Sequence, residues 1–319
     1  MKQLISTLLI CFLIQIEAFR APWDPALPEV SNFVPVKGQP LMLPANYTKV
    51  QLRALTGILF VDTFTKLFNV DEIRIFQSNV KGIEAGALCT PPNLKVLELD
   101  FSNNQNPPVI KKSTFANCGN NLESLTVAFN EIYRPRLSED TFYNLYNLRE
   151  LVLRNQNIDH LTKRWFNNMK WLQVLVLENC RIQQIDPNVL EPLNNLRRLE
   201  ITHNRGLTYL PRNLFKYTPV LEILLLVANR ITDITWNEFE GLNRLKELSL
   251  AANRIDYFDA TKVARFMPNL KKLFIEQNMG SCRKKLDFKD KLQAKMDHPI
   301  HVQYTLDPGS YDDCKHFDD

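Results

Sequence analysis

The chain has 319 residues, of which 45% are apolar, and its formal net charge is +4. This length and composition suffice to bury a large core in one or two domains, and they exclude a low-complexity chain. The net charge is too small to indicate nucleic-acid binding by itself.

The first residues have the pattern of a secretory signal peptide. Lys2 supplies the positive charge, residues 4–16 form a short apolar run, and Ala18 precedes the expected cleavage point. The run is short for a membrane span, although an uncleaved anchor is the alternative. We therefore expect residues 1–18 to be removed and the mature chain to be secreted and extracellular.

Residues 19–46 precede the repeats described next and are expected to form an N-terminal cap. They contain no cysteine, so apolar packing must hold this cap. The packing side chains are predicted to be Trp23, Phe33, Val34, Leu41 and Leu43. Asn46 begins the sequence Asn-Tyr-Thr, the only N-glycosylation sequon in the chain, and is predicted to be glycosylated.

A single phrase of the form Leu-x-x-Leu-x-Leu-x-x-Asn-x-Ile recurs over residues 47–281. Clear copies occupy residues 122–132, 221–231 and 245–255. Successive copies start 23 to 28 residues apart, which gives about ten units. A period in the mid-twenties with this consensus is typical of leucine-rich repeats.

Each phrase predicts one strand whose alternate leucines face a core. In residues 151–153, for example, two leucines flank an outward Val152. One strand cannot bury its inward face alone, so stacked units should form a parallel sheet over a continuous core. The rest of each unit is too short for a long helix and its connections. We predict an α/β solenoid, a curved leucine-rich repeat horseshoe with a concave sheet and a convex side of 3₁₀ and extended segments.

On the predicted convex side, a proline pair interrupts this regularity and a recurring phenylalanine reinforces it. The longest unit contains Pro107 and Pro108, which forbid a regular helix there and predict a local bulge or protruding loop. A phenylalanine returns at the same place in many units and is expected to fill the outer half of the core. These residues are Phe142, Phe166, Phe215, Phe239 and Phe266.

Cys180 stands at the asparagine position of its unit. Asparagine side chains at this turn are expected to lie inside and to bond backbone groups left unpaired. The repeat consensus accepts cysteine at this position. We expect Cys180 to be buried, unpaired and inert, because an apolar site raises the pKa of a thiol. A nucleophile assisted by His203 is the alternative.

Four other cysteines in the mature chain suggest two disulfides. Cys89 and Cys118 lie at nearly equivalent places in successive units, so they should be neighbours on the convex edge and form a bond. Cys282 follows the last repeat and Cys314 lies near the end of the chain. A bond between them would tie a C-terminal cap, residues 282–319, over the exposed end of the core.

The C-terminal cap contains a basic run, residues 283–296, with apolar residues at near-helical spacing. These apolar residues are Leu286, Phe288, Leu292 and Met296. The pattern predicts a short amphipathic helix that covers the end of the core. The alternative is a docking site for acidic polysaccharide or membrane.

No catalytic motif is present in the sequence. The HExxH, GxSxG, P-loop and GxGxxG patterns are all missing. His298 and His301 lie in the cap without further converging ligands, whereas zinc sites use three or four. Residues 138–140 contain two acidic residues that are expected to serve a turn. We predict that the protein is not an enzyme and holds no metal or cofactor.

The outward residues between the repeated leucines should line the concave face and bind a partner. Apolar residues cluster among them and should form an exposed patch surrounded by polar residues, which is typical of a protein-binding surface. The alternative is that valine and leucine simply suit strands. The candidate residues are Arg74, Phe76, Glu98, Phe101, Phe129, Val152, Arg154, Val176, Glu178, Glu200, Leu225, Val227 and Phe274.

The signal peptide, the ten units and the cysteine-closed end together resemble the extracellular leucine-rich repeat proteins of insects. Within this group, the chain is most similar to a short mosquito leucine-rich immune protein without a coiled coil. The resemblance implies a secreted recognition or adaptor protein of innate immunity. It also implies extracellular protein partners, such as complement-like factors.

A second hypothesis is a matrix or adhesive protein that binds an anionic polymer through the basic C-terminal cap. Salt-sensitive binding to a heparin-like polymer would favour it. Neither hypothesis involves nucleic acid or a membrane span.

Overall fold

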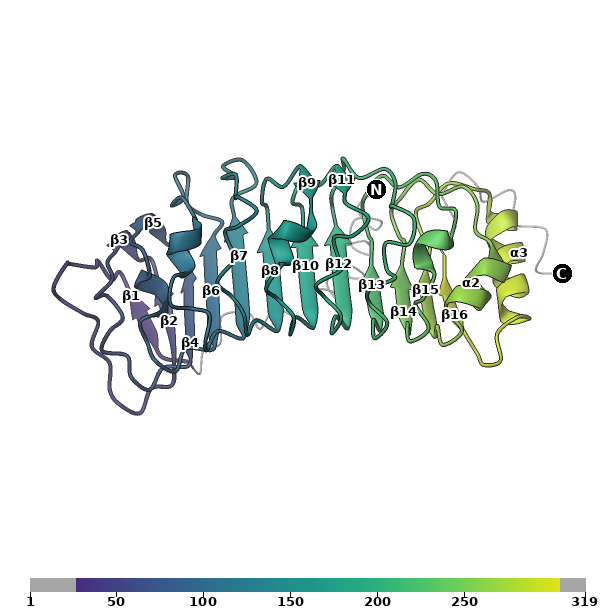
Figure 1. Ribbon diagram of the computed structural model, residues 1–319. Helices are drawn as coiled ribbons and strands as arrows, with labels where there is room; N and C mark the ends of the chain where they lie inside the picture. The colour runs from purple at the N-terminus through teal and green to yellow at the C-terminus, as the bar shows by residue number, and fades with distance from the viewer. Residues whose placement is uncertain (1–26, 305–319) are drawn as a thin grey trace.

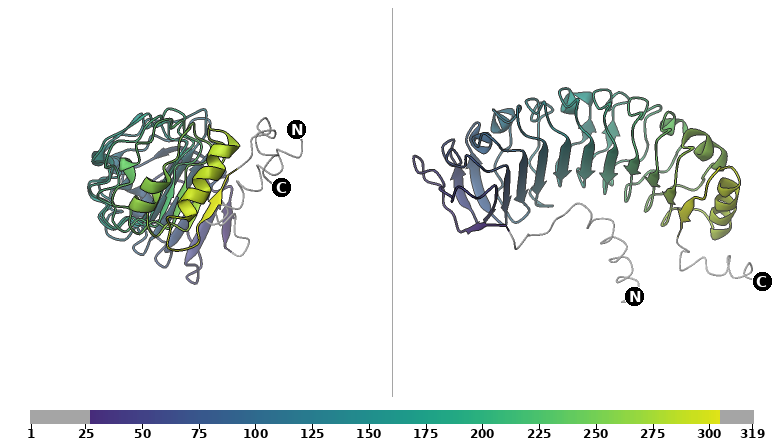
Figure 2. Two further views of the ribbon diagram at one scale, coloured as in Figure 1. Left: turned by 90° about the vertical axis from the view of Figure 1, so that its right-hand side faces the viewer. Right: turned by 90° about the horizontal axis from the view of Figure 1, so that it is seen from below.

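Alternating leucines build one strand per unit in the computed structural model, which describes residues 27–304 (Figure 1). Within these residues, twelve parallel strands form the main sheet in the order of the chain. They are β1 (Glu29–Ser31), β2 (Lys49–Arg53), β4 (Glu72–Phe76), β6 (Val96–Phe101), β7 (Ser124–Phe129), β8 (Glu150–Arg154), β10 (Val174–Glu178), β12 (Arg198–Thr202), β13 (Ile223–Leu225), β14 (Glu247–Ser249), β15 (Lys272–Phe274) and β16 (His301–Gln303). The strands line the inner side of an arc (Figure 2), so the predicted horseshoe with a parallel concave sheet is confirmed.

The register of the sheet follows from the repeated leucines. Leu151 lies between Leu125 of β7 and Leu175 of β10, and all three side chains are fully buried. A side chain that fills the core therefore meets the same position of the next unit. This stacking gives the continuous apolar core that no single unit could form.

The convex side combines short 3₁₀ helices with turns and extended segments, as unit length predicts. They are η1 (Ala87–Cys89), η2 (Lys112–Phe115), η3 (Lys163–Phe166) and η4 (Asn237–Phe239). Two small two-stranded sheets pair β3 (Thr56–Leu59) with β5 (Asn79–Ile83), and β9 (His160–Leu161) with β11 (Gln184–Ile185). Stacked phenylalanines fill the outer core, with ring centroids 5.6 Å apart for Phe115 and Phe142 and for Phe215 and Phe239.

The unit that starts at residue 245 carries an α-helix, α2 (Ala260–Phe266), where the unit length predicts only 3₁₀ or extended segments. Asp259 explains the difference, because its side chain accepts hydrogen bonds from the backbone N–H groups of Thr261 and Lys262. An N-cap of this kind satisfies the first orphan donors of a helix and stabilises one turn.

The segment with Pro107 and Pro108 contains no helix from residue 102 to residue 111, as its prolines predict. Asn104 is buried and its side chain donates to the carbonyl oxygen of Val80 over 2.7 Å. The asparagine that serves this turn therefore lies two residues beyond its expected place, since the longer unit delays the turn.

Short added strands and packed side chains close the two ends of the sheet. At the N-terminal end, Leu41 is buried, and Phe33 and Leu43 pack against the core, but Val34 is 57% exposed. Its predicted packing role is wrong, because β1 has ended and the backbone there has left the sheet. Trp23 lies outside the described residues, as does the signal peptide.

At the C-terminal end, the predicted amphipathic helix is present as α3 (Cys282–Gln293). Leu292 is fully buried, and Phe288 packs against Phe258 with ring centroids 5.4 Å apart. The proposed partner of Cys282, Cys314, lies outside the described residues, so that disulfide stays a prediction.

Cys89 and Cys118 form a disulfide, and their Cα atoms are 5.0 Å apart. Cys89 ends η1, and Cys118 follows η2 in the next unit. The prediction from their equivalent positions is confirmed, because stacked units bring them within the separation that a disulfide requires.

Candidate functional site: the concave face and its rim

A row of buried asparagines follows the strands and sets the turn into the convex side. Asn204 donates from Nδ2 to the carbonyl oxygens of Leu177 and Thr202, and its Oδ1 accepts from the backbone N–H groups of Cys180 and Ile182. Asn229, Asn253 and Asn278 make corresponding bonds to their preceding units. Each asparagine therefore fixes both its own turn and that of the preceding unit.

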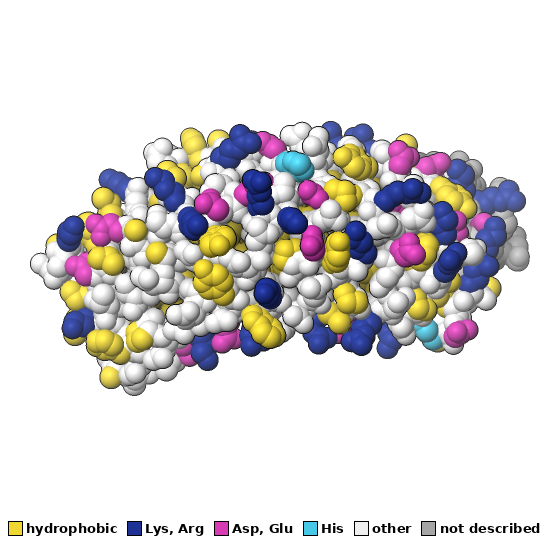
Figure 3. Space-filling view, viewed as in Figure 1, with side chains coloured by type: hydrophobic (Ala, Val, Ile, Leu, Met, Phe, Trp, Pro, Cys, Tyr) yellow, Lys and Arg dark blue, Asp and Glu magenta, His cyan; other side chains and the backbone are white. Residues whose placement is uncertain are grey.

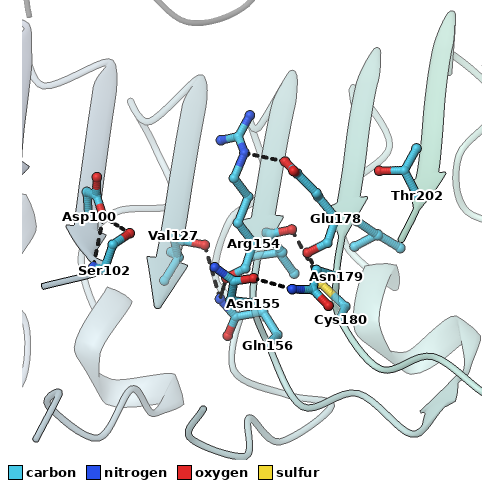
Figure 4. Close-up of polar contacts among 12 residues, drawn as sticks. Asp100, Ser102, Val127, Arg154, Asn155, Gln156, Glu178, Asn179, Cys180 and Thr202 are labelled. Atoms are coloured by element: carbon cyan, nitrogen blue, oxygen red, sulfur yellow. Dashed lines mark hydrogen bonds and ion pairs between the residues drawn. The ribbon is translucent and has the colours of Figure 1, made fainter. Parts of the chain in front are cut away.

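Cys180 occupies this row and does part of the work of an asparagine (Figure 4). It is fully buried and unpaired, and its thiol donates to the carbonyl oxygens of Leu153 and Glu178 over 3.4 Å each. Burial raises the pKa of the thiol to about 12. A thiol in that state is protonated at neutral pH and is a poor nucleophile, which confirms the prediction of a buried, unpaired cysteine.

The prediction of partner binding is wrong for two residues, because their side chains face the core. Phe101 and Phe129 are fully buried, with ring centroids 5.6 Å apart. They end β6 and β7, which run one residue beyond neighbouring strands such as β8. Side chains alternate along a strand, so Phe101 continues the inward series of Leu97 and Leu99.

The apolar residues of the concave face are present at the predicted register but are not exposed as predicted. Val152, Val176, Leu225 and Phe274 retain between 4% and 8% of their accessible surface. Neighbouring strands lie only about 4.8 Å apart, and the concave curvature brings outward side chains closer together. The predicted exposed apolar patch is therefore replaced by a tightly packed apolar floor.

Charged side chains flank this floor and are paired across or within strands. Arg154 Nε lies 2.7 Å from Glu178 Oε2, so an ion pair joins β8 to β10 (Figure 4). In β12, Arg198 and Glu200 form a second pair, 2.6 Å apart. The middle of the sheet therefore presents partly buried charges whose orientation is fixed.

A denser cluster lies nearer the N-terminal end, where Arg74 contacts both Glu72 and Glu98. Lys49 Nζ also lies 2.9 Å from Glu72. Burial opposes ionisation of Glu72, but the hydrogen bonds and charges of Lys49 and Arg74 hold its pKa below the usual value. Phe76 and Val227, also predicted for this face, are half-buried.

The rim of the concave face carries a loop that the repeat pattern did not identify. Residues 131–136 extend over the ends of β8 and β10, and Arg134 Nη1 donates to the carbonyl oxygen of Asn179 over 2.7 Å. Asn179 in turn donates to Asn155 Oδ1 over 2.8 Å. The anchored loop presents Ile132 and Tyr133, which are 78% and 44% exposed. The sequence signal is the non-repeat segment Tyr-Arg-Pro, residues 133–135, directly after the repeat isoleucine Ile132.

The two cap histidines do not converge on one site. Both ring nitrogens of His298 lie near backbone carbonyl oxygens, those of Pro299 and Pro268, whereas His301 packs against Phe274. Within residues 27–304, no three histidine, cysteine, aspartate or glutamate side chains are grouped to hold a metal ion. Ser138 bonds Asp140 Oδ1 locally over 2.7 Å, which fits a turn.

The sequence matches a family model described as leucine rich repeat over residues 146–205 and 194–255. No curated protein gives a significant match. The fold is similar to a chain in the octameric complex of Latrophilin 3, Unc5D and FLRT2, where FLRT2 supplies the leucine-rich repeat. That match has a TM-score of 0.59 and 18% identity, and covers 83% of this chain and 85% of that one. The chain therefore carries a leucine-rich repeat domain.

Two further structures share the fold of this leucine-rich repeat protein. One is a chain of the Toll–Spatzle complex of Drosophila, with a TM-score of 0.53 and 19% identity over 73% of this chain and 38% of that one. The other is an internalin, InlF, from Listeria monocytogenes, with a TM-score of 0.55 and 18% identity over 82% and 75%. Identities this low support the fold and not a shared function.

Within the described part of the leucine-rich repeat protein, no helix has the length and apolar character needed to cross a bilayer.

Proposed function

We propose that this leucine-rich repeat protein is a secreted recognition or adaptor module of innate immunity that binds another extracellular protein. The binding surface is the concave sheet around Arg154 and Glu178, together with the rim loop, residues 131–136. The remaining outward residues of the candidate set, from Arg74 to Phe274, extend this surface along the sheet.

The observation that carries the proposal is the anchored rim loop beside fixed charges. Ile132 and Tyr133 are exposed although Arg134 ties their loop to Asn179. An apolar side chain and a tyrosine beside oriented polar groups are typical of the central contacts in protein interfaces. Because the loop is already held, binding would cost little ordering entropy.

Two findings support an extracellular, immune setting. The Cys89–Cys118 disulfide is typical of proteins in oxidising compartments. The fold is also similar to that of a chain in the Toll–Spatzle complex, which is described as a hub in Drosophila development and innate immunity. Asn46 is exposed and therefore accessible to a glycan.

The test is capture of partners from the extracellular fluid of the source organism with the secreted chain as bait. The variant Ile132→Asp/Tyr133→Ser should lose a protein that the native bait retains, because it removes the apolar contacts without touching the core. The matched control is Tyr257→Ser, which changes a tyrosine that is 68% exposed and lies far from the rim loop. Equal capture by all three baits would contradict the proposed surface.

A second candidate function is binding of an anionic polymer by α3. Figure 3 shows basic side chains gathered at the right-hand end of the molecule, where α3 lies. Arg283, Lys284 and Lys291 are exposed there. However, Lys284 and Lys291 already pair with Asp256 and Asp287 at 3.4 Å and 2.7 Å, which lowers the charge available. This function would be favoured if the chain were retained on a heparin column, if salt abolished the retention, and if Arg283→Ala/Lys284→Ala reduced it.

A further inference from the structure

A second row of asparagines lies at the opposite edge of the sheet, where each unit enters its strand. Asn93, Asn121 and Asn147 each stand directly before the first leucine of their unit. Their Nδ2 atoms donate to the carbonyl oxygens of Phe68, Pro92 and Asn120, and all three side chains lie at the surface. Unlike the buried row, this row leaves polar atoms facing water.

Trp171 interrupts the row. It occupies the place that Asn147 and Asn195 occupy in the flanking units, and its side chain is 56% exposed. The other described tryptophans, Trp165 and Trp236, are almost fully buried. Trp171 therefore places a large aromatic surface in water at a position that the repeat fills with a small amide.

Trp171 closes one end of a groove of about 450 Å³ that the asparagine row lines. This volume is in the range of ligand-binding sites. Lys95, Glu123 and Arg149 form the other wall, and Glu123 pairs with Arg149 at 3.4 Å and with Lys95 at 3.9 Å. The wall therefore offers donors and acceptors, and its two cations and one carboxylate leave a net charge of +1.

The amides keep hydrogen-bonding capacity for a ligand. Asn93, Asn121 and Asn147 donate hydrogen bonds through Nδ2. Within the described residues, their Oδ1 atoms accept none. Asn120 also lines the groove. Each carboxamide oxygen can accept two hydrogen bonds, so the groove can receive several hydroxyl groups along one direction.

We propose that this groove binds a neutral oligosaccharide, with one sugar ring stacked on Trp171. A pyranose has an apolar C–H face for the indole and a rim of hydroxyl groups for the amides and the paired charges. The net charge of +1 on the wall is too small to select a strongly anionic ligand, and a single aromatic in a polar groove gives little of the apolar core that a protein interface requires. This site is separate from the concave face and from the proposed partner surface.

The test uses calorimetric titration with two neutral probes, cellotetraose and chitotetraose, whose β-1,4-linked rings present flat faces. Trp171→Asn restores the residue of the flanking units, so the variant should fold normally, which circular dichroism would check. We expect at least one probe to bind the native chain and to bind Trp171→Asn at least about tenfold more weakly. Trp171→Phe should recover part of the affinity because it keeps an aromatic face.

Tyr209→Ser is the matched control, since it removes an exposed aromatic outside the groove. Iodide quenching of tryptophan fluorescence gives a second readout. Part of the emission that iodide can quench should be lost in Trp171→Asn, and in the native chain the bound probe should shield that part from iodide. Equal affinity of the native chain and Trp171→Asn would overturn the proposal. Absence of binding to these probes and to every neutral glycan of an array, or Trp171-dependent capture of a protein that no glycan displaces, would also overturn it.

Discussion

Replacing Asn204 by alanine should destabilise the fold far more than the same replacement at an exposed asparagine of the same unit. Asn204 is fully buried, and its Oδ1 accepts from Cys180 N over 2.8 Å and from Ile182 N over 3.2 Å. Within the described residues, these two N–H groups have no other acceptor. An unsatisfied buried donor costs about 1–3 kcal/mol, so Asn204→Ala should cost about 4 kcal/mol. The two carbonyl oxygens that Asn204 Nδ2 serves add less, because Thr202 O also accepts from Asn179 N.

The control is Asn195→Ala, since Asn195 makes one hydrogen bond, to Lys170 O, at the surface. Water replaces that bond, and the expected cost is below about 1 kcal/mol. Urea unfolding followed by circular dichroism would measure both variants, with comparison of the m-values as a check that the transition is unchanged. If the two substitutions cost the same, the buried asparagine row would not hold the turns and the reasoning would be refuted.

Three further outcomes follow from the geometry. Burial raises the pKa of Cys180 from 9.0 to about 12. The stability that the buried, protonated thiol contributes is therefore complete below pH 9 and is lost as pH rises toward 12. Relative to Cys180→Ser, the native chain should lose about 1.4 kcal/mol per pH unit above pH 9, and parallel stability curves in chemical denaturation would contradict this. Cys89→Ser/Cys118→Ser opens a disulfide between residues 29 positions apart and should cost about 3.5 kcal/mol. No change in the urea midpoint would show that the cross-link constrains nothing. Val152→Asp places a carboxylate where 4% of the side chain is exposed and should cost at least about 2 kcal/mol, whereas Val152→Thr should cost less, because Thr126 occupies the same column in β7. Equal thermal stability of the two variants would mean that the column is open to water.

The core could be predicted from the sequence because the repeat imposes one environment on each position. The place of Cys180 among the asparagines predicted its burial, and the equivalent places of Cys89 and Cys118 predicted their bond. A position in a stacked array inherits its surroundings from its neighbours, so comparison within one chain is sufficient.

The concave face was predicted less well, for two physical reasons. Phe101 and Phe129 were assigned outward because β6 and β7 extend one residue beyond the common strand length, which no periodicity reveals. Val152 and Leu225 do point outward, but the curvature of the sheet covers them. Neither strand length nor curvature is visible in the identity of single residues.

The groove beside Trp171 and the rim loop were not predicted at all. The groove is formed by pre-strand residues of four units, from Asn93 to Trp171, and becomes a site only when the units are stacked. The loop reaches across two units through Arg134, and contacts at that range leave no local pattern.

The Cys89–Cys118 disulfide has a mechanical consequence. Apart from the contact of Arg134 with Asn179, the units contact mainly their neighbours, so a chain pulled from its ends would unfold unit by unit. The bond withholds from extension the chain between the two cysteines, which are 29 positions apart, or about 100 Å of contour length at 3.3–3.6 Å per residue. Stretching in the presence of a reductant should release this hidden length. The protein would then lengthen further under the same load, so the redox state of its surroundings would determine its extended length.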